Sequence, residues 1–208
     1  MPDFSLEEEC GGLVAGVDEA GRGPWAGPVI SAAVILPREL RAELKGGLDD
    51  SKKLTPQKRS ALFTLLQCCA DIGIGAASVA EIECQNILGA TLLSMTRAIT
   101  GLDTAPHRVL IDGNHLPKNI ACPGQAVVKG DSISLSIAAA SIVAKVTRDK
   151  IMSTLAVRYP VYGWEKNAGY GTRQHQRGLS THGISPHHRR SFAPISRIIA
   201  PLIDEPLI

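Results

Sequence analysis

Four acidic residues stand where the sequence predicts the ends of short strands. Asp18 and Asp112 each follow an apolar run and precede a glycine-bearing turn, and Asp131 follows a third run, "AVVKG". Glu19 comes directly after Asp18. Carboxylate oxygens are the ligands that Mg²⁺ and Mn²⁺ prefer, and pairs of such ions can activate water and stabilise the leaving oxygen of a phosphodiester. If the strands are neighbours, the pattern predicts a metal site for phosphodiester cleavage.

Each acid also has a simpler explanation. An aspartate before glycine commonly satisfies the backbone N–H groups of a turn, and Asp131 stands where it could cap the long helix that follows. Adjacent residues of a regular strand point to opposite faces. Asp18 and Glu19 therefore share a site only if the strand has begun to bend at Glu19, which Gly21 permits. Four acids in matching contexts still favour a shared site.

Asp149 competes with Asp131 for the fourth place. The two are eighteen residues apart, which is about 27 Å along a continuous helix, so they cannot serve the same centre. Asp149 lies four residues after Lys145, and this spacing favours an ion pair on the helix surface.

A glycine-framed arginine follows the first acids: Gly21, Arg22 and Gly23. The stretch "GRGPWAG" loosely resembles a dinucleotide-binding fingerprint, but that motif requires a helix to open at the glycines. Two prolines and a β-branched run follow instead. We therefore predict a loop whose bare backbone approaches a ligand closely, with Arg22 available for a phosphate.

The elements that must position these residues follow from apolar spacing and caps. Strands are predicted over residues 13–18, 28–36, 71–78, 107–112 and 125–131; helices begin after the caps Thr55 and Ser78 and cover about 88–100, 133–158, 173–182 and 193–203; residues 159–172 form a loop. Early strands mixed with helices favour an α/β or α+β sheet domain with a helical C-terminal extension.

Composition narrows the class of protein. The chain has 208 residues, of which 44% are hydrophobic and 20% are charged, which is typical of a globular protein. No apolar stretch approaches the roughly 20 residues that a membrane span needs, and the acidic N-terminus does not resemble a secretory signal. We therefore expect a cytoplasmic protein without a membrane partner, whose five cysteines are buried free thiols.

The net charge of +2 is too small to indicate nucleic-acid binding by itself. Basic residues cluster at Lys52 with Lys53, at Lys145 with Arg148 and Lys150, at Arg173 with Arg177, and in "HHRR" at 187–190. These clusters allow a polyanionic partner. The histidines at 175, 182, 187 and 188 do not form a convincing zinc set, and their basic surroundings suggest surface or phosphate contacts.

Seven segments carry a family resemblance. They are "GVDEAGRGPWAGPV", "DDSKKLT", "LIDGN", "VVKGD", "SIAAASIVAKVTRD", "NAGYGT" and "HGISPHHRRSF". In this order, over roughly residues 13–192, they resemble bacterial ribonuclease HII, the type 2 ribonuclease H.

The resemblance implies a fold and an activity. The fold is an α/β ribonuclease H-like mixed sheet flanked by helices, in a single domain over residues 1–208. Its catalytic core covers about 11–160, and a junction-sensing loop and helical extension cover about 161–208. The implied activity is endonucleolytic: cleavage of the RNA strand of RNA–DNA hybrids and nicking on the 5′ side of single ribonucleotides in duplex DNA, leaving 3′-hydroxyl and 5′-phosphate ends. Mn²⁺ or Mg²⁺ is the implied cofactor, and nothing in the sequence demands an oligomer, so a monomer is expected.

The resemblance also assigns residues. The family's metal ligands fall on Asp18, Glu19, Asp112 and Asp131. Gly21, Arg22 and Gly23 would read the ribose 2′-hydroxyl, which distinguishes RNA from DNA, and Tyr170 would pack on the deoxyribose that follows the ribonucleotide. Lys52 and Lys53 would contact phosphates, although a solvated surface pair explains them nearly as well. Ala168 stands where the family often has lysine, which removes one expected contact to the nucleic acid.

Two alternative functions stay open at this point. One is another nuclease or resolvase of the same fold with a different substrate. The other is a non-catalytic nucleic-acid-binding protein, which the four acids disfavour because carboxylates without a cation repel phosphates.

Overall fold

A five-stranded mixed sheet forms the centre of the computed structural model, which describes residues 1–40 and 42–203. The strands are β1 (Val14–Ala20), β2 (Val29–Ile35), β3 (Asp71–Ala77), β4 (Arg108–Asp112) and β5 (Gly124–Val127), in the order β3-β2-β1-β4-β5. β1 runs antiparallel to β2 and parallel to β4, and β5 runs parallel to β4. The predicted α/β sheet is confirmed, and β1, β4 and β5 end at the same edge.

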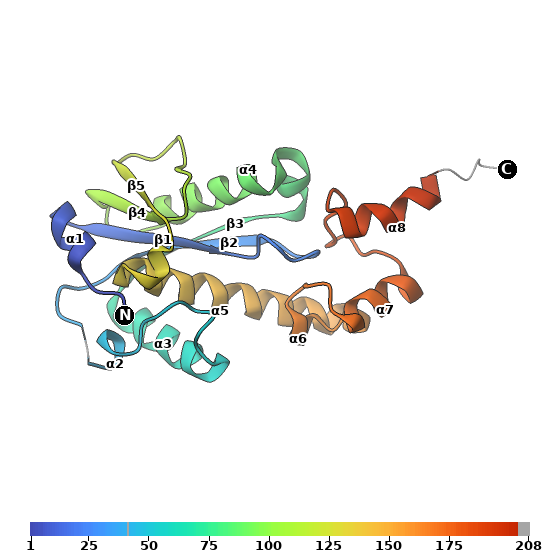
Figure 1. Ribbon diagram of the computed structural model, residues 1–208, viewed down its shortest axis with the longest axis horizontal. Coiled ribbons are helices and arrows are strands. Elements are labelled where there is room, and N and C mark those ends of the chain that lie inside the picture. The colour runs from blue at the N-terminus through green and yellow to red at the C-terminus, as the bar shows by residue number, and fades with distance from the viewer. Residues whose placement is uncertain (41, 204–208) are drawn as a thin grey trace.

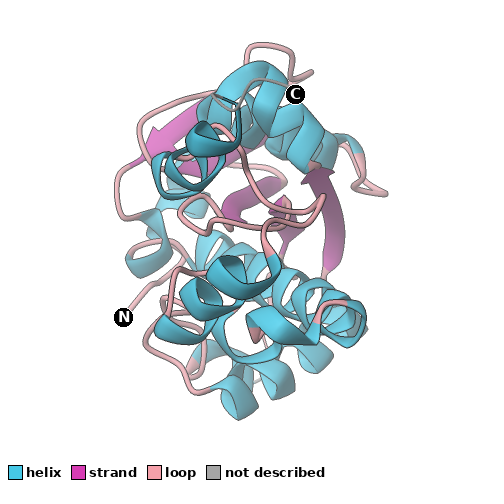
Figure 2. Ribbon diagram, turned by 90° about the vertical axis from the view of Figure 1, so that its right-hand side faces the viewer, coloured by secondary structure: helices cyan, strands magenta, loops and turns pink. Residues whose placement is uncertain are grey.

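Helices cover both faces of the sheet (Figures 1 and 2). They are α1 (Ser5–Cys10), α2 (Ala42–Lys45), α3 (Pro56–Cys69), α4 (Val79–Thr100), α5 (Leu135–Arg158), α6 (Trp164–Asn167), α7 (Arg173–His182) and α8 (Ala193–Ile203), with 3₁₀ turns η1 (Gly130–Ser132) and η2 (Pro160–Tyr162). α4 packs on one face, and α5 packs on the other with α3 beside it. Helices α6 to α8 lie at one end of the molecule, beyond the end of β1 (Figure 1).

The core explains why the central strands are so apolar. All seven residues of β2 are buried, because helices cover both of its faces. α5 packs so closely on β1 that a Cβ at Gly16 would lie 2.1 Å from the backbone carbon of Ser136. The small side chains of the "SIAAAS" stretch in α5 are buried at this contact. The sequence therefore places α5 directly over the strand that carries Asp18.

The predicted helix caps are present. The Thr55 hydroxyl accepts a hydrogen bond from the Lys58 N–H, and Ser78 and Glu81 form a complete capping box. The predicted helix start near Leu88 is confirmed: a kink at Asn86 divides α4, and its second part begins there. Asn86 adopts φ 59°, and its side chain accepts hydrogen bonds from the N–H groups of Leu88 and Gly89, so it caps the second part of α4.

Some local predictions are wrong. β1 continues to Ala20 rather than ending at Asp18, and the predicted loop at 159–172 contains η2 and α6. The cysteines are not buried: Cys68 and Cys84 are exposed, and the other three are partly exposed. Cys68 lies on the solvent side of α3, whose buried residues are Leu62, Phe63 and Leu66.

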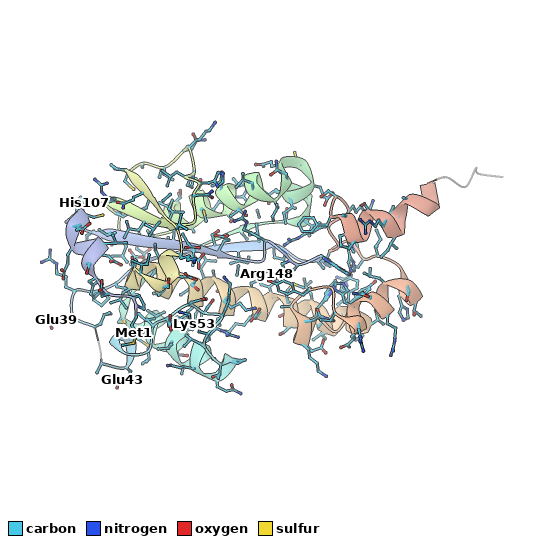
Figure 3. The ribbon with its side chains drawn as sticks, viewed as in Figure 1. Met1, Glu39, Glu43, Lys53, His107 and Arg148 are labelled. Atoms are coloured by element: carbon cyan, nitrogen blue, oxygen red, sulfur yellow. The ribbon has the colours of Figure 1, made fainter. Side chains whose placement is uncertain are left out.

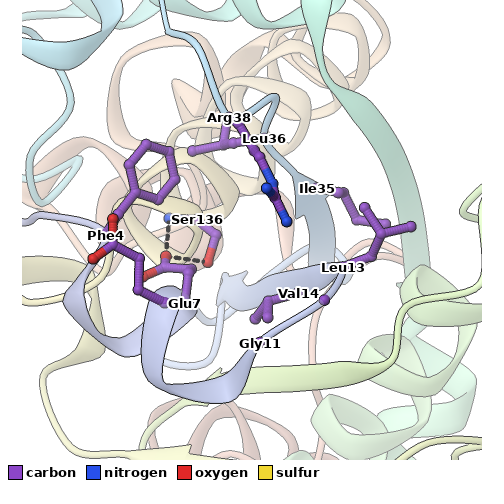
Figure 4. A pocket seen from close by; sticks show the side chains of 11 residues that line it. Phe4, Glu7, Gly11, Leu13, Val14, Ile35, Leu36, Arg38 and Ser136 are labelled. Carbon is purple, nitrogen blue, oxygen red and sulfur yellow. Dashed lines mark hydrogen bonds between the residues drawn. The ribbon is translucent and has the colours of Figure 1, made fainter.

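A cavity of about 340 Å³ lies at the start of β1, away from the ends of the parallel strands (Figure 4). Glu7 lines it and accepts hydrogen bonds from the Ser134 hydroxyl and from the N–H and hydroxyl of Ser136. A carboxylate at the first turn of a helix is favourable, so Glu7 anchors the N-terminal segment to α5. None of the predicted site residues lines this cavity.

A helix that crosses a membrane must be both long and apolar. No helix within residues 1–40 and 42–203 has the length and the apolar composition that such a span needs.

Candidate active site

Asp18 and Asp112 come from neighbouring parallel strands. The register pairs Val17 with Ile111, so the two acids occupy the next position along each strand. Val17 and Ile111 both pack in the cluster on the α4 side of the sheet. Because side chains alternate along a strand, Asp18 and Asp112 both face the α5 side. The structure therefore brings these two predicted residues together.

Asp131 lies in the turn η1, which enters α5 on the same side of the sheet. The Gly130 N–H donates a hydrogen bond of 2.7 Å to Asp112 Oδ1, which ties this turn to the end of β4. Asp131 does not cap α5, because that role belongs to the Ser134 hydroxyl, which accepts from the Ile137 N–H. The helix-cap explanation for Asp131 is therefore wrong, and this buried carboxylate is available to the site.

Glu19 differs from its prediction. The chain does not bend at this residue, since Glu19 still pairs with Ser31 of β2 in regular register. Its carboxyl group nevertheless lies near the other acids, since the Asp112 charge contributes to raising its pKa, and it forms an ion pair of 3.2 Å with Arg22 Nη1. The Asp18 carboxylate bonds to the backbone of the next residue: its Oδ1 accepts a hydrogen bond of 2.7 Å from the Glu19 N–H.

The acids repel one another in the absence of a cation. Burial raises the pKa of Asp18 well above its usual value, and the negative charges of Glu19, Asp112 and Asp131 raise it further. Burial also raises the pKa of Asp131, together with the charges of Asp50 and Asp112. Burial raises the pKa of Glu19 too, although the Arg22 guanidinium opposes that shift. Such a field strongly favours a bound cation.

Asp50 and Lys52 extend this field from the loop before α3. Burial alone would lower the pKa of Lys52, but the charges of Asp50 and Asp18, with those of Asp131 and Asp112, raise it. Asp50 is a site residue that the sequence patterns do not predict, and its only signal is its place in "DDSKK". The Nζ of Lys53 instead forms an exposed ion pair of 3.0 Å with Asp49 Oδ1.

The Gly-Arg-Gly loop and Tyr170 lie side by side. Gly21 has φ +102°, and a Cβ on Gly23 would lie 3.5 Å from the Tyr170 ring. The Arg22 side chain is exposed, and Tyr170 is 50% exposed, so both side chains are open to a ligand. Ala168, at the position where lysine was expected, adopts a left-handed conformation with φ 47°. Backbone and ring thus form one open surface beside the acids.

Several basic residues that were predicted to lie on the surface, where they could contact a polyanion, are buried. Asp149 pairs with Lys145 at 2.8 Å, as predicted, but Arg148 between them is buried. In "HHRR", His188 and Arg189 are buried rather than exposed to a polyanion, and so is His175. Hydrogen bonds to backbone carbonyls and between the two rings explain why these polar groups are inside.

The hydrogen-bond partners of the buried histidines determine which ring nitrogen carries the proton. Tyr170 O lies 2.9 Å from His175 Nδ1, so this nitrogen carries the proton. His175 Nε2 then accepts from His188 Nε2 at 2.9 Å, and His188 Nδ1 accepts from the Ser185 N–H at 2.9 Å. Burial and the neighbouring His175 lower the pKa of His188 to about 4. Both rings are therefore neutral at neutral pH.

We expect His188 to make the protein less stable in acid. The unfolded chain binds a proton at His188 as the pH falls below about 6.5, whereas the folded protein does so only near pH 4. Its contribution is complete above pH 6.5 and is lost as the pH falls toward 4. Between pH 7 and 5 the wild type should lose up to roughly 2 kcal/mol more unfolding free energy than His188→Gln. Urea denaturation at both pH values measures this, and equal losses in both proteins would contradict it.

A mixed sheet that gathers carboxylates at the ends of adjacent strands, beside an open glycine loop, is the arrangement of a phosphodiester-cleaving nuclease. Residues 15–195 match the family model for ribonuclease HII. The chain belongs to the ribonuclease HII family, and it is a ribonuclease H that hydrolyses the RNA strand of RNA–DNA hybrids.

Relatives and solved structures agree with this family. The chain is 56% identical over 198 residues to ribonuclease HII of Jannaschia sp. (strain CCS1), covering 95% of this chain and 98% of the relative. It is 55% identical over 201 residues to ribonuclease HII of Gluconobacter oxydans (strain 621H), covering 96% and 97%. The crystal structure of ribonuclease H2 from Pyrococcus horikoshii OT3 superposes with a TM-score of 0.76 at 26% identity, covering 93% of this chain and all of that one. Bst-RNase HIII in complex with Mn²⁺ shares the fold, with a TM-score of 0.73 at 18% identity over 97% of this chain and 74% of that one.

Proposed function

We propose that Asp18, Glu19, Asp112 and Asp131 hold the divalent cations, Mn²⁺ or Mg²⁺, that hydrolysis requires. The observation that carries this proposal is the placement of Asp18 and Asp112 at adjacent register positions on one face of the sheet. The Mn²⁺ named for the Bst-RNase HIII structure supports the choice of ion. When bound, such ions lower the pKa of water and neutralise charge on the leaving oxygen.

The donor set fits hard cations, because all four side chains offer carboxylate oxygens. Asp18, Glu19 and Asp112 each direct an oxygen to a protein partner. Within the described part of the chain, no three acidic, histidine or cysteine side chains are already arranged around one centre. Cation binding therefore requires these carboxylates to turn toward a common point, where the charge of the cation would offset their mutual repulsion.

The neighbouring surface would bind the substrate at an RNA-to-DNA junction. Backbone groups of Gly21 and Gly23 can approach the 2′-hydroxyl without steric hindrance, and the exposed Arg22 can approach a phosphate. Tyr170 would pack its exposed ring on the next deoxyribose. Lys52, which faces the acids, is a better phosphate ligand than Lys53, whose Nζ is paired with Asp49.

This arrangement leads us to expect nicking on the 5′ side of single ribonucleotides in duplex DNA, with 3′-hydroxyl and 5′-phosphate ends. The test is cleavage of an end-labelled duplex that contains one ribonucleotide, beside the same duplex in DNA alone, with and without Mn²⁺. We expect one cut, 5′ of the ribonucleotide, only when metal is present. Equal cutting of the all-DNA duplex would favour a resolvase-like nuclease, and binding without any cut would favour a non-catalytic protein. We expect the chain to act as a monomer in the cytoplasm.

Divalent cations should also stabilise the folded protein. At ten times the dissociation constant, Mn²⁺ should raise the Tm by roughly 3–6 °C, because binding relieves the repulsion at Asp18. Asp18→Asn should lose most of this rise, while its metal-free Tm should not fall, since the variant removes a buried charge. Differential scanning calorimetry measures both values. An equal rise in the wild type and in Asp18→Asn would place the cation elsewhere.

A further inference from the structure

The segment 185–189 contacts both substrate-facing loops. Its backbone pairs with the chain after the Gly-Arg-Gly loop: the Arg189 N–H donates to Trp25 O at 2.8 Å, and the Gly27 N–H donates to His187 O at 2.9 Å. Figure 1 places this connection, between α7 and α8, at the end of the molecule where β1 finishes. The segment is therefore attached directly to the chain that leaves β1.

Arg189 binds the backbone of the Gly-Arg-Gly loop from the buried side of the loop. Its guanidinium is completely buried and donates to the carbonyl oxygens of Gly21, Arg22 and Gly27. In the described residues it has no carboxylate partner within ion-pair distance. Burial, with the charge of Arg148, lowers its pKa to about 9. An unpaired buried cation is costly, and here its hydrogen bonds fix the carbonyls of the loop that would read the 2′-hydroxyl.

The histidine pair holds the other loop. His175 donates to Tyr170 O, and His188 donates to His175, so the backbone at Tyr170 is tied to the residue next to Arg189. The Trp164 indole N–H also approaches His175 Nε2, at 3.3 Å. The chain of hydrogen bonds thus runs from Ser185 through both rings to Tyr170, and it continues through the backbone to Arg189.

Arg148 adds a direct link between the two loops. It lies between α5 and the sheet (Figure 3), and it donates to Pro28 O at 2.9 Å, to Ala26 O at 3.0 Å and to Ala168 O at 2.8 Å. The Ala168 carbonyl belongs to the loop that carries Tyr170. The Trp25 N–H also donates to Gly169 O at 2.9 Å, so a backbone hydrogen bond, Arg148 and the segment 185–189 together fix the distance between the Gly-Arg-Gly loop and Tyr170.

We propose that Arg189 and the His175–His188 pair are positioning residues that determine the preference for a single ribonucleotide over a continuous hybrid. This proposal rests on the substrate roles proposed above for the Gly-Arg-Gly loop and Tyr170. In a continuous hybrid, the sugar under Tyr170 carries a 2′-hydroxyl, and a ring held at fixed height disfavours that extra oxygen. Loss of the hydrogen bonds made by His188 or Arg189 lets the Tyr170 ring move away from the sugar. The preference for a single ribonucleotide then falls, while cleavage of a continuous hybrid continues.

The test compares kcat/KM on a duplex with one ribonucleotide and on a continuous RNA–DNA hybrid. His188→Leu removes the donor to His175, and Arg189→Met removes the donors to the loop. We expect each to lower the ratio of the two kcat/KM values at least about tenfold. His188→Gln keeps an N–H at the position of Nε2 and should return the ratio to within about threefold of the wild type.

A stability control separates positioning from general damage. Leu179 is buried on α7 beside His175 but makes no side-chain hydrogen bond to either loop, so Leu179→Ala should destabilise the protein without changing the ratio. If His188→Leu and Leu179→Ala reduce both activities by one common factor, the role is only structural and the proposal is wrong. An unchanged ratio in His188→Leu would also overturn it.

Tyr170→Ala distinguishes this proposal from the one on which it rests. If Tyr170→Ala leaves the ratio unchanged, the junction-sensing role of Tyr170 fails, and the positioning proposal fails with it. If Tyr170→Ala lowers the ratio but His188→Leu does not, only the positioning proposal fails. We expect both to lower it, and the double variant to lose no more than Tyr170→Ala alone, because both changes remove the same contact.

Discussion

Asp112→Asn should lower kcat on RNA–DNA hybrids by at least about 10³-fold while leaving the fold intact. The substitution removes one of the two acids that lie side by side on β1 and β4, and with it a charge that attracts the cation. The amide oxygen of asparagine can still accept the hydrogen bond from the Gly130 N–H, so η1 should stay in place. Steady-state cleavage and circular dichroism measure the two parts of this prediction.

Asp149→Asn is the matched control for this loss. It makes the same chemical change at an acid whose partner is Lys145 on the surface of α5. Surface ion pairs contribute little to stability, so both the activity and the Tm should stay close to those of the wild type. Substrate binding by Asp112→Asn should also persist. Full activity of Asp112→Asn, or a loss in Asp149→Asn as large as in Asp112→Asn, would contradict the assignment.

Gly21→Ala should destabilise the protein and reduce cleavage at single ribonucleotides. The backbone at Gly21 has φ +102°, which strains any residue with a Cβ, and that Cβ would lie 2.1 Å from Arg148 Nε and 2.8 Å from Pro28 O. Strain and overpacking together should cost about 2–5 kcal/mol of unfolding free energy. Urea denaturation measures the loss of stability, and the nicking assay at a temperature where the variant is folded measures the loss of activity.

Gly183→Ala separates strain from collision. Gly183 also has a positive φ, +71°, but a Cβ there would meet nothing within 4 Å. With ψ −157° this backbone lies in a region that is open almost only to glycine, so the variant should show only the strain, about 1–3 kcal/mol, with normal nicking. Equal destabilisation by the two variants would mean that Arg148 moves aside easily, and the close packing behind the Gly-Arg-Gly loop would then not matter.

Local patterns predict where the apolar strands lie but not always where they end. Apolar runs that end at Asp18 and Asp112 predict strand ends at both acids; β4 does end at Asp112, whereas β1 continues to Ala20. That β1 and β4 are parallel neighbours is a tertiary fact, and only the structure shows it. The same holds for Glu19, where pairing with β2 keeps the strand regular beyond the predicted end.

The burial of four polar side chains is the structural feature that the sequence predicts least well. Arg148, Arg189, His175 and His188 all occur in basic stretches that predict a charged surface, and all four are buried. Their partners are mostly backbone carbonyls of segments far away in the chain, such as Gly21 and Ala168. Local charge patterns contain no information about such partners.

The domain organisation stays a prediction. We expect residues 1–208 to act as one domain, and of these Arg41 and residues 204–208 lie outside the described residues.

Anomalous diffraction at the manganese edge, from crystals of this protein soaked in Mn²⁺, tests the metal site most directly. We expect peaks bounded by the carboxylates of Asp18, Glu19, Asp112 and Asp131, with the side chains turned toward them, and no peak in crystals of Asp18→Asn. Manganese bound only at other positions, with these four carboxylates still directed to their protein partners, would contradict the account.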